Sequence, residues 1–85
     1  MRKTFEAMHE GHVIQVENTW FKGERLYIDG ELQDENVGLA LRASLRGAVT
    51  NHKGETQEIK VTLGGTTKIE CKIFADNRLI ESRAL

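Results

Sequence analysis

The run His9-Glu10-Gly11-His12 places two imidazoles and a carboxylate within four residues near the start of the chain. These groups ligate metals, but structural metal sites use four ligands at a recognisable spacing. A helix would set the two histidines on nearby turns, whereas an extended chain would not, and the single cysteine, Cys71, is far away in the sequence. We therefore predict no metal and no cofactor here, and expect His12 to begin a strand after a solvated N-terminal segment.

The other reactive side chains do not form a catalytic pattern. Asp29, Glu31, Asp34 and Glu35 make an acidic stretch without the spacing and glycine of a calcium loop. Cys71 alternates with apolar residues, so we expect a small buried hydrophobe with no base beside it to lower its pKa. The sequence also contains neither a glycine-rich phosphate loop nor a nucleophile elbow. We predict that the protein is not an enzyme.

The pair Trp20-Phe21 is the best candidate for a contact site. It lies in a turn region between two expected strands, next to Lys22 and shortly before Arg25. Exposed aromatic side chains mark contact surfaces, and tryptophan is enriched among the residues that dominate binding energy. The pattern predicts a binding loop with Lys22 and Arg25 at its rim, for an unidentified protein or a second copy of the chain. The alternative is that one or both rings fold back and close the open end of the sheet.

A basic stripe is predicted on the polar face of the sheet, made of Arg42, Arg46, Lys60, Lys68 and Lys72. Such a stripe can follow a nucleic-acid backbone, so weak nucleic-acid binding through the Arg42/Arg46/Lys68 face is the alternative function. Arg46, Thr62 and Lys68 are expected to align across three strands, but Glu58 and Glu70 interrupt the stripe, and we expect no aromatic side chain there. With a net charge of −1, the chain has no overall field that attracts polyanions. Nucleic acid is therefore not the expected partner.

The spacing of the apolar residues predicts the elements that position these side chains. From Leu39 to Ile73 the apolar residues fall on odd numbers, in three runs: Leu39, Leu41, Ala43, Leu45, Val49; Ile59, Val61, Leu63; and Ile69, Cys71, Ile73. A period of two is typical of a strand with one buried and one solvated face. A helix over 37–48 is the rival interpretation, because Leu, Ala and Arg favour helices. A helix, however, has no reason to keep the parity that continues into the next two runs.

Hairpin registers follow because directly opposed residues share a face. Setting Ile14 opposite Ile28 puts Val16 opposite Leu26 and leaves a loop from 19 to 23. Asp29-Gly30 is a strong signal for the next two-residue turn.

The later hairpins are predicted by the same rule. Val61 opposite Ile69 leaves the three-residue loop Gly64-Gly65-Thr66 with a bulge. Val49 is expected opposite Ile59, which leaves a long loop between these two strands.

Two segments of the sequence are weak echoes of each other. Residues 26–32 and 73–79 both read as a strand that enters a two-residue Asx turn. In each, an aromatic residue is expected opposite a leucine, giving the pairs Tyr27–Leu32 and Phe74–Leu79. Strands that are apolar on both faces need cover on both sides, which favours a sandwich or a rolled sheet.

These features predict one all-β domain over residues 1–85, with a poorly patterned segment at 1–11. Phe5 and Met8 in this segment fit either a short helix or an edge strand. We expect a small antiparallel β-sandwich or open barrel of six or seven strands, connected largely as a meander. No apolar run approaches the ~18 residues of a membrane span. A single cysteine and an N-terminus without an apolar leader favour the cytoplasm.

The run from His12 to Glu17 and the run from Gly23 to Glu31 resemble the opening hairpin of the Fas apoptotic inhibitory molecule family. The ending from Ile73 to Ile80 is similar to the closing hairpin of that family, and together these segments cover about a third of the chain. The resemblance implies an antiparallel β-sandwich that acts through protein contacts and has no catalytic residues. We therefore predict a non-catalytic protein-interaction module with a contact loop around Trp20.

Overall fold

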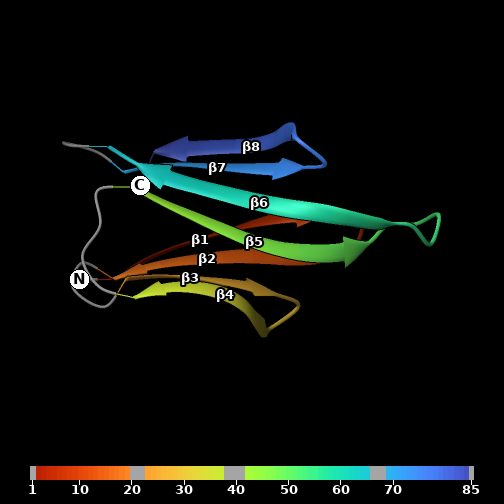
Figure 1. The fold of residues 1–85 in the computed structure, drawn as a ribbon, viewed down its shortest axis with the longest axis horizontal. Helices are drawn as coiled ribbons and strands as arrows, with labels where there is room; N and C mark the ends of the chain where they lie inside the picture. Colours follow the sequence, from red (N-terminus) through yellow and green to blue (C-terminus); the bar gives the residue numbers. More distant parts are fainter. Residues whose placement is uncertain (1, 20–22, 38–41, 66–68, 85) are drawn as a thin grey trace.

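The computed structural model describes residues 2–19, 23–37, 42–65 and 69–84, and it is built from two four-stranded antiparallel sheets (Figure 1). The first sheet contains β1 (Arg2–His9), β2 (His12–Thr19), β3 (Gly23–Ile28) and β4 (Glu31–Val37). The second contains β5 (Arg42–Thr50), β6 (Thr56–Gly64), β7 (Glu70–Ala75) and β8 (Arg78–Ala84). Both sheets are meanders in chain order. The predicted all-β sandwich is confirmed.

The strand count differs from the prediction of six or seven, because residues near the N-terminus form a full strand. β1 pairs with β2 along its whole length, and Phe5 and Ala7 enter the core. Of the two structures open for Phe5 and Met8, the edge strand is present, whereas the expectation of a solvated segment is wrong. The rival helix over 37–48 is also wrong where the structure describes this region, since β5 begins at Arg42; residues 38–41 lie outside the described residues. The described residues contain no helix that is long and apolar enough to cross a membrane.

The hydrophobic core fills the space between the two sheets. Its most deeply buried members come from both sheets and are Ile14, Val16, Leu26, Leu45, Ile59, Val61, Cys71 and Ile73. Every odd-numbered apolar residue whose burial is described from Leu45 to Ile73 is buried or packs against this core, as the period-two pattern predicts. Leu39 and Leu41 lie outside the described residues. Inward faces that interdigitate in this way are the basis of sandwich stability.

The first-sheet register is confirmed, whereas two registers of the second sheet are wrong. Ile14 lies opposite Ile28, and Val16 lies opposite Leu26. Val61, however, lies opposite Ile73 rather than Ile69, so the strands are separated by residues 65–69 instead of a three-residue loop.

The β5–β6 register is shifted in the same way, with Gly47 rather than Val49 opposite Ile59. Both shifts are even numbers of residues. They keep the same side chains on the buried face, and parity therefore cannot distinguish them from the predicted registers.

Three two-residue turns use positive φ at both central residues, which suits the right-handed twist of a hairpin. They are Glu10-Gly11 (φ 50° and 79°), Asp29-Gly30 (52° and 83°) and Asp76-Asn77 (48° and 67°). Glycine, asparagine and aspartate reach this conformation more readily than other residues. The predicted Asp29 and Asp76 turns are confirmed.

The weak sequence echo is a true structural repeat. The Asp29 amide donates to the Val13 carbonyl, and Asp29 Oδ1 accepts from the Val13 amide, both at 2.9 Å. Asp76 makes the same two bonds with Glu58, also at 2.9 Å. The predicted pairs Tyr27–Leu32 and Phe74–Leu79 are present, and each is followed by a bulge in the outer strand.

The sheets contact each other closely along one long side and through a cation–aromatic contact on the other. On one side β5 lies against β3 and β4, where the Arg46 amide donates to Asp34 Oδ2 at 2.9 Å. Gly47 permits this close approach, because a Cβ built there would lie 2.9 Å from Ile28 Cδ1. On the other side the Arg83 guanidinium lies 5.7 Å from the centre of the Phe5 ring.

Candidate functional site

The predicted binding loop is only partly described. Trp20, Phe21 and Lys22 lie outside the described residues, but the loop joins the ends of β2 and β3, where Thr19 and Gly23 are cross-strand partners. Gly23 also pairs with Val37, whose side chain is 78% exposed. An exposed apolar side chain therefore lies beside the root of this loop.

Arg25, the fourth predicted site residue, is held by carboxylates on the neighbouring strands. Its Nε donates to Glu35 Oε2 at 3.0 Å, and its Nη1 lies 3.9 Å from Glu17 Oε1. The hydrogen bond to Glu35 raises the pKa of the guanidinium, which stays charged. Arg25 thus lies in an ion-pair row across β2, β3 and β4.

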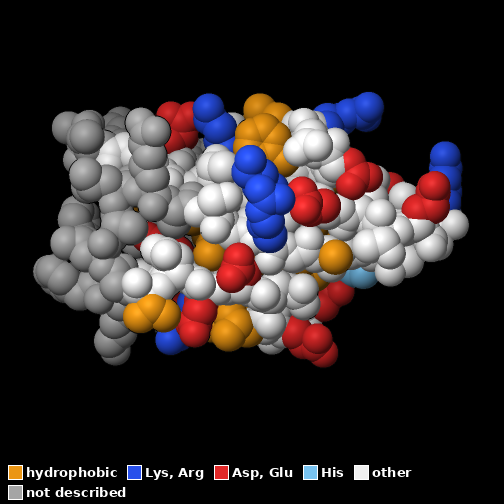
Figure 2. Space-filling view, in the orientation of Figure 1, with side chains coloured by type: hydrophobic (Ala, Val, Ile, Leu, Met, Phe, Trp, Pro, Cys, Tyr) orange, Lys and Arg blue, Asp and Glu red, His pale blue; other side chains and the backbone are white. Residues whose placement is uncertain are grey.

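The exposed large apolar side chains all lie on edge strands. Among the described residues they are Met8 on β1, Leu32 and Val37 on β4, and Leu79 on β8. Figure 2 shows apolar side chains gathered over β3–β4 and over β7–β8 on one face of the molecule. For the exposed Met8 on β1, the available sequence signal was the alternation Phe5-Glu6-Ala7 just before it. The sequence alone did not decide which element this segment forms. Exposed apolar residues at a sheet edge are typical of interaction surfaces.

The four edge strands differ in how well their backbone is protected. β4 and β8 each carry a bulge, at Gln33 and Ile80, where the register shifts. On β5, the Arg46 amide is occupied by the Asp34 carboxylate. β1 is eight residues long and pairs with β2 without any register shift. Bulges and inward-pointing charges discourage edge-to-edge pairing. β1 has no bulge, and its one charge on the same side of the strand as Phe5 and Ala7 is Lys3, near the start of the strand.

The basic stripe is arranged differently from the prediction. Arg46 lies opposite Lys60, Lys60 lies opposite Phe74, and Thr62 lies opposite Ser44, so the predicted alignment of Arg46 with Thr62 is wrong. The expectation of no aromatic residue on this face is also wrong, because Phe74 shares it. The side chain of Arg42 and all of Lys68 lie outside the described residues.

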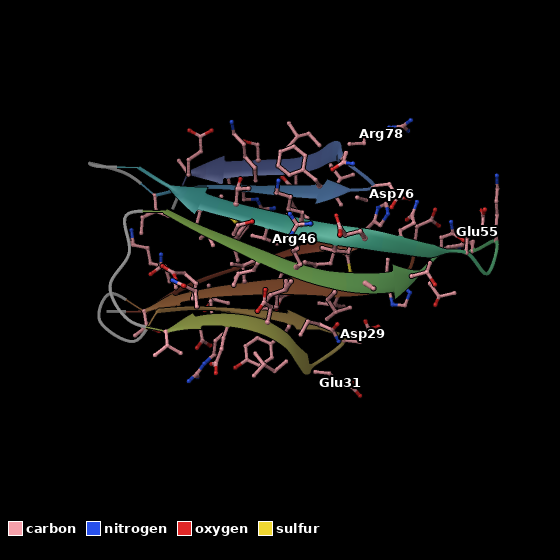
Figure 3. The ribbon with its side chains drawn as sticks, viewed as in Figure 1. Asp29, Glu31, Arg46, Glu55, Asp76 and Arg78 are labelled. Atoms are coloured by element: carbon pink, nitrogen blue, oxygen red, sulfur yellow. The ribbon has the colours of Figure 1, made fainter. Side chains whose placement is uncertain are left out.

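Carboxylates neutralise much of this face. Arg46 Nη1 bonds to Glu58 Oε2 at 3.2 Å, and Lys72 Nζ lies 3.4 Å from Glu70 Oε1. Figure 3 shows Arg46 in the middle of the face, in front of the second sheet. A shallow hollow of about 730 Å³ lies beside it and is lined by Ser44, Lys60, Thr62, Leu63, Gly64, Gly65, Glu70 and Lys72.

The histidine and carboxylate candidates are used in bonds within the fold. His12 begins β2, as predicted, and its ring bonds to Asp29 and to the Thr50 carbonyl. Asp34 accepts from the amides of Glu35 and Arg46. No three His, Cys, Asp or Glu side chains within the described ranges are grouped so that they could hold a metal ion.

Cys71 is fully buried on the inner face of β7, opposite Leu63. Burial raises the pKa of its thiol to about 12. Because the thiolate is the nucleophile, a thiol with such a pKa is unreactive at neutral pH. The interpretation of Cys71 as a small buried hydrophobe fits this position.

We expect Cys71 of the folded protein to resist Ellman's reagent at pH 8. The thiolate fraction alone slows its reaction on the order of 1,000-fold relative to an ordinary cysteine, and burial slows it further. Full reactivity should return when urea unfolds the protein, which serves as the positive control. Rapid labelling of the folded protein would show that Cys71 is accessible.

No protein-family model, curated protein or solved structure matches the chain. The resemblance to the Fas apoptotic inhibitory molecule family therefore stays a prediction.

Proposed function

We propose that this protein is a non-catalytic protein-interaction module that receives an extended segment of its partner along β1. The observation that carries the proposal is that β1 is an eight-residue edge with regular pairing, whereas β4 and β8 are bulged and the Arg46 amide in the middle of β5 is occupied by Asp34. An extended segment that adds to a sheet edge gains main-chain hydrogen bonds, and its side chains select the partner.

The side chains of β1 suit this mode of binding. Met8 is 67% exposed and offers a flexible apolar contact at one end of the strand. Phe5 and Ala7 point into the core and hold the strand in place, so an added segment meets a rigid template. The partner is an unidentified protein or a second copy of the chain.

Cys71 and the acidic stretch support a non-catalytic function. The Cys71 thiol is buried, and Asp29 and Asp34 bind backbone amides of the fold. Side chains that are committed to structural bonds are poorly placed for proton transfer, which needs a group within reach of the substrate.

The Trp20 loop is proposed as a second contact on the first sheet. Val37 lies at the root of this loop and extends the apolar surface on β4. Trp20 is the only tryptophan in the chain, so its fluorescence reports on this contact alone. Replacement of Trp20 by alanine is expected to weaken partner binding if the loop touches the partner. An unchanged affinity would remove the loop from the interface.

The edge proposal is tested with a matched pair of variants. Met8→Lys puts a charge on the unbulged edge β1, and Leu79→Lys puts the same charge on the bulged edge β8, where Leu79 is 50% exposed. The binding assays are light scattering against protein concentration and photo-crosslinking from position 6 in a cell lysate. We expect Met8→Lys to lose at least about tenfold in affinity, equivalent to 1.4 kcal/mol, and Leu79→Lys to behave as the wild type. Equal behaviour of the two variants would contradict binding along β1.

Weak nucleic-acid binding is a second candidate function, favoured by the position of Phe74 opposite Lys60, which itself lies opposite Arg46. An aromatic ring can stack a base while a neighbouring cation contacts the phosphate. Fluorescence polarisation with a single-stranded oligonucleotide tests this candidate. Binding should fall steeply with salt and be lost in Phe74→Ser. An affinity that does not change with salt concentration would exclude nucleic-acid binding through these cations.

A further inference from the structure

The three histidines of the chain meet at one end of the sandwich, and each bonds from the first half of the chain to the second. His9 Nε2 lies 2.9 Å from Gln57 Oε1, His12 Nε2 donates to the Thr50 carbonyl at 2.7 Å, and His52 Nε2 lies 3.2 Å from Glu10 Oε2. Here the β1–β2 turn approaches the β5–β6 loop, at the end where Figure 3 labels Asp29 and Glu55. The histidines therefore join the two sheets.

The bonds of His12 define its protonation state. Its Nδ1 lies 2.6 Å from Asp29 Oδ2, and its Nε2 lies 2.7 Å from the Thr50 carbonyl. A carboxylate and a carbonyl only accept hydrogen bonds, so both ring nitrogens must carry a proton. A neutral imidazole has one N–H and must give up one of these two bonds.

We propose that the three imidazoles form a pH-sensitive clamp between the two sheets, which is closed when His12 is an imidazolium and loosens when His12 becomes neutral. The groups that face His12 are Asp29 from the β3–β4 turn, the Thr50 carbonyl from β5, and Glu10 from the β1–β2 turn. Glu10 also holds His52 of the β5–β6 loop. On β1, the cross-strand partner of His12 is His9, which bonds to Gln57 of β6. The cation thus lies between two carboxylates and a carbonyl.

The direction of the pH dependence follows from both partners of the ion pair. The hydrogen bond to Asp29 raises the pKa of His12 above its ordinary 6.5. The stabilisation from His12 is therefore complete below pH 6.5 and is lost as the pH rises through its folded pKa. The bond from His12 lowers the pKa of Asp29 below 3.8, so the Asp29 contribution is complete above pH 3.8 and is lost as the pH falls through that folded pKa. The clamp is closed most firmly between these two limits.

The structural repeat supplies an internal control. Asp76 occupies the same turn position as Asp29 and makes the same two backbone bonds, to Glu58. The two turns share their backbone bonds. Asp29 has one further bond, which it receives from the imidazole of His12, the first residue of β2. Asp29→Asn keeps an acceptor oxygen for the Val13 amide and a residue that tolerates positive φ, but it removes the charge that holds the imidazolium. Asp76→Asn makes the same change without a histidine.

The test combines an NMR titration of the histidine rings with urea unfolding at pH 5.5 and pH 9. We expect His12 to titrate above 6.5, and each unit of that increase to make the folding constant tenfold larger at pH 5.5 than at pH 9. Asp29→Asn should lower the pKa of His12 and reduce this ratio, while Asp76→Asn should leave the ratio as in the wild type.

Two results would overturn the clamp. One is a His12 pKa at or below 6.5 in the folded wild type, which needs no variant to fold. The other is an equal effect of Asp29→Asn and Asp76→Asn on the ratio. Hydrogen exchange gives a local measurement, in which the Gly54 amide, bonded to the Asn51 carbonyl at 3.0 Å, should lose protection at pH 9 before the core strands do. Loss of protection in all strands together would indicate global unfolding instead of an opening at this end.

Discussion

Replacing Gly23 by alanine is expected to lower the stability of this protein strongly. Gly23 begins β3 with φ 101°, and a Cβ built there would lie 1.8 Å from the Asn36 carbonyl oxygen and 2.8 Å from its carbon. Those atoms belong to the backbone of β4, so relief of the clash requires that β3 and β4 move apart. Positive-φ strain alone costs about 1–3 kcal/mol, and the separation of the strands adds to it.

We expect Gly23→Ala to lower the free energy of unfolding by at least about 3 kcal/mol. A domain of this size has roughly 0.05–0.15 kcal/mol of stability per residue in total, so the expected loss is a large fraction of its stability. Urea unfolding followed by circular dichroism measures the loss. Two causes contribute to this loss: the clash of the new Cβ with the Asn36 backbone, and the strain of a residue other than glycine at positive φ.

Gly54→Ala is the matched control for this prediction. Gly54 has φ 80°, but no atom outside its chain neighbours lies within 4 Å of a Cβ built there. Its substitution therefore carries the backbone strain without the clash, and about 1 kcal/mol is expected. If Gly23→Ala and Gly54→Ala lose the same stability, the close approach of β3 and β4 is not as the structure shows it.

The second large effect is expected for Leu26→Ala in the core. Leu26 is fully buried on β3, opposite Val16 of β2. Truncation of a buried leucine to alanine costs about 2–5 kcal/mol, through lost burial and the cavity left behind. Because the inner faces of both sheets share one core, the cavity cannot be closed by a small shift of one strand. Urea unfolding should show a lower midpoint with an unchanged slope.

Leu32→Ala is the matched control on β4, the other strand of the same hairpin. It removes a leucine from the outer face, so its cost excludes the contribution of core packing. Leu32 is 50% exposed and lies opposite Tyr27 on the outer face. Its truncation should cost less than about 1 kcal/mol, the range of a cross-strand pair. A loss as large as that of Leu26→Ala would mean that the outer face is covered, for instance by a second copy of the chain.

The buried face of the second sheet could be predicted from the sequence because side chains alternate strictly along a strand. Leu45, Val61 and Ile73 are buried as the odd parity requires. The pairing of those residues could not be predicted, since a shift by two or four residues preserves the alternation. In the structure residues 65–69 lie between β6 and β7, so Val61 pairs with Ile73.

β1 shows a signal that was present but too short to interpret alone. Phe5 and Ala7 alternate with Thr4 and Glu6, yet an isolated strand has no stability of its own and gains it by pairing. The assignment becomes clear once β2 lies beside it and both inward residues enter the core.

The sequence alone determined the period of two, the Asx turns and the pairs Tyr27–Leu32 and Phe74–Leu79, because these depend on local backbone geometry and on neighbours within one hairpin. Only the tertiary structure decided which edge strands carry a bulge and which groups meet at the histidine end. His9 and Gln57 are 48 residues apart, and His12 and Thr50 are 38 apart. Contacts over such separations depend on how two complete sheets pack, which no local pattern encodes.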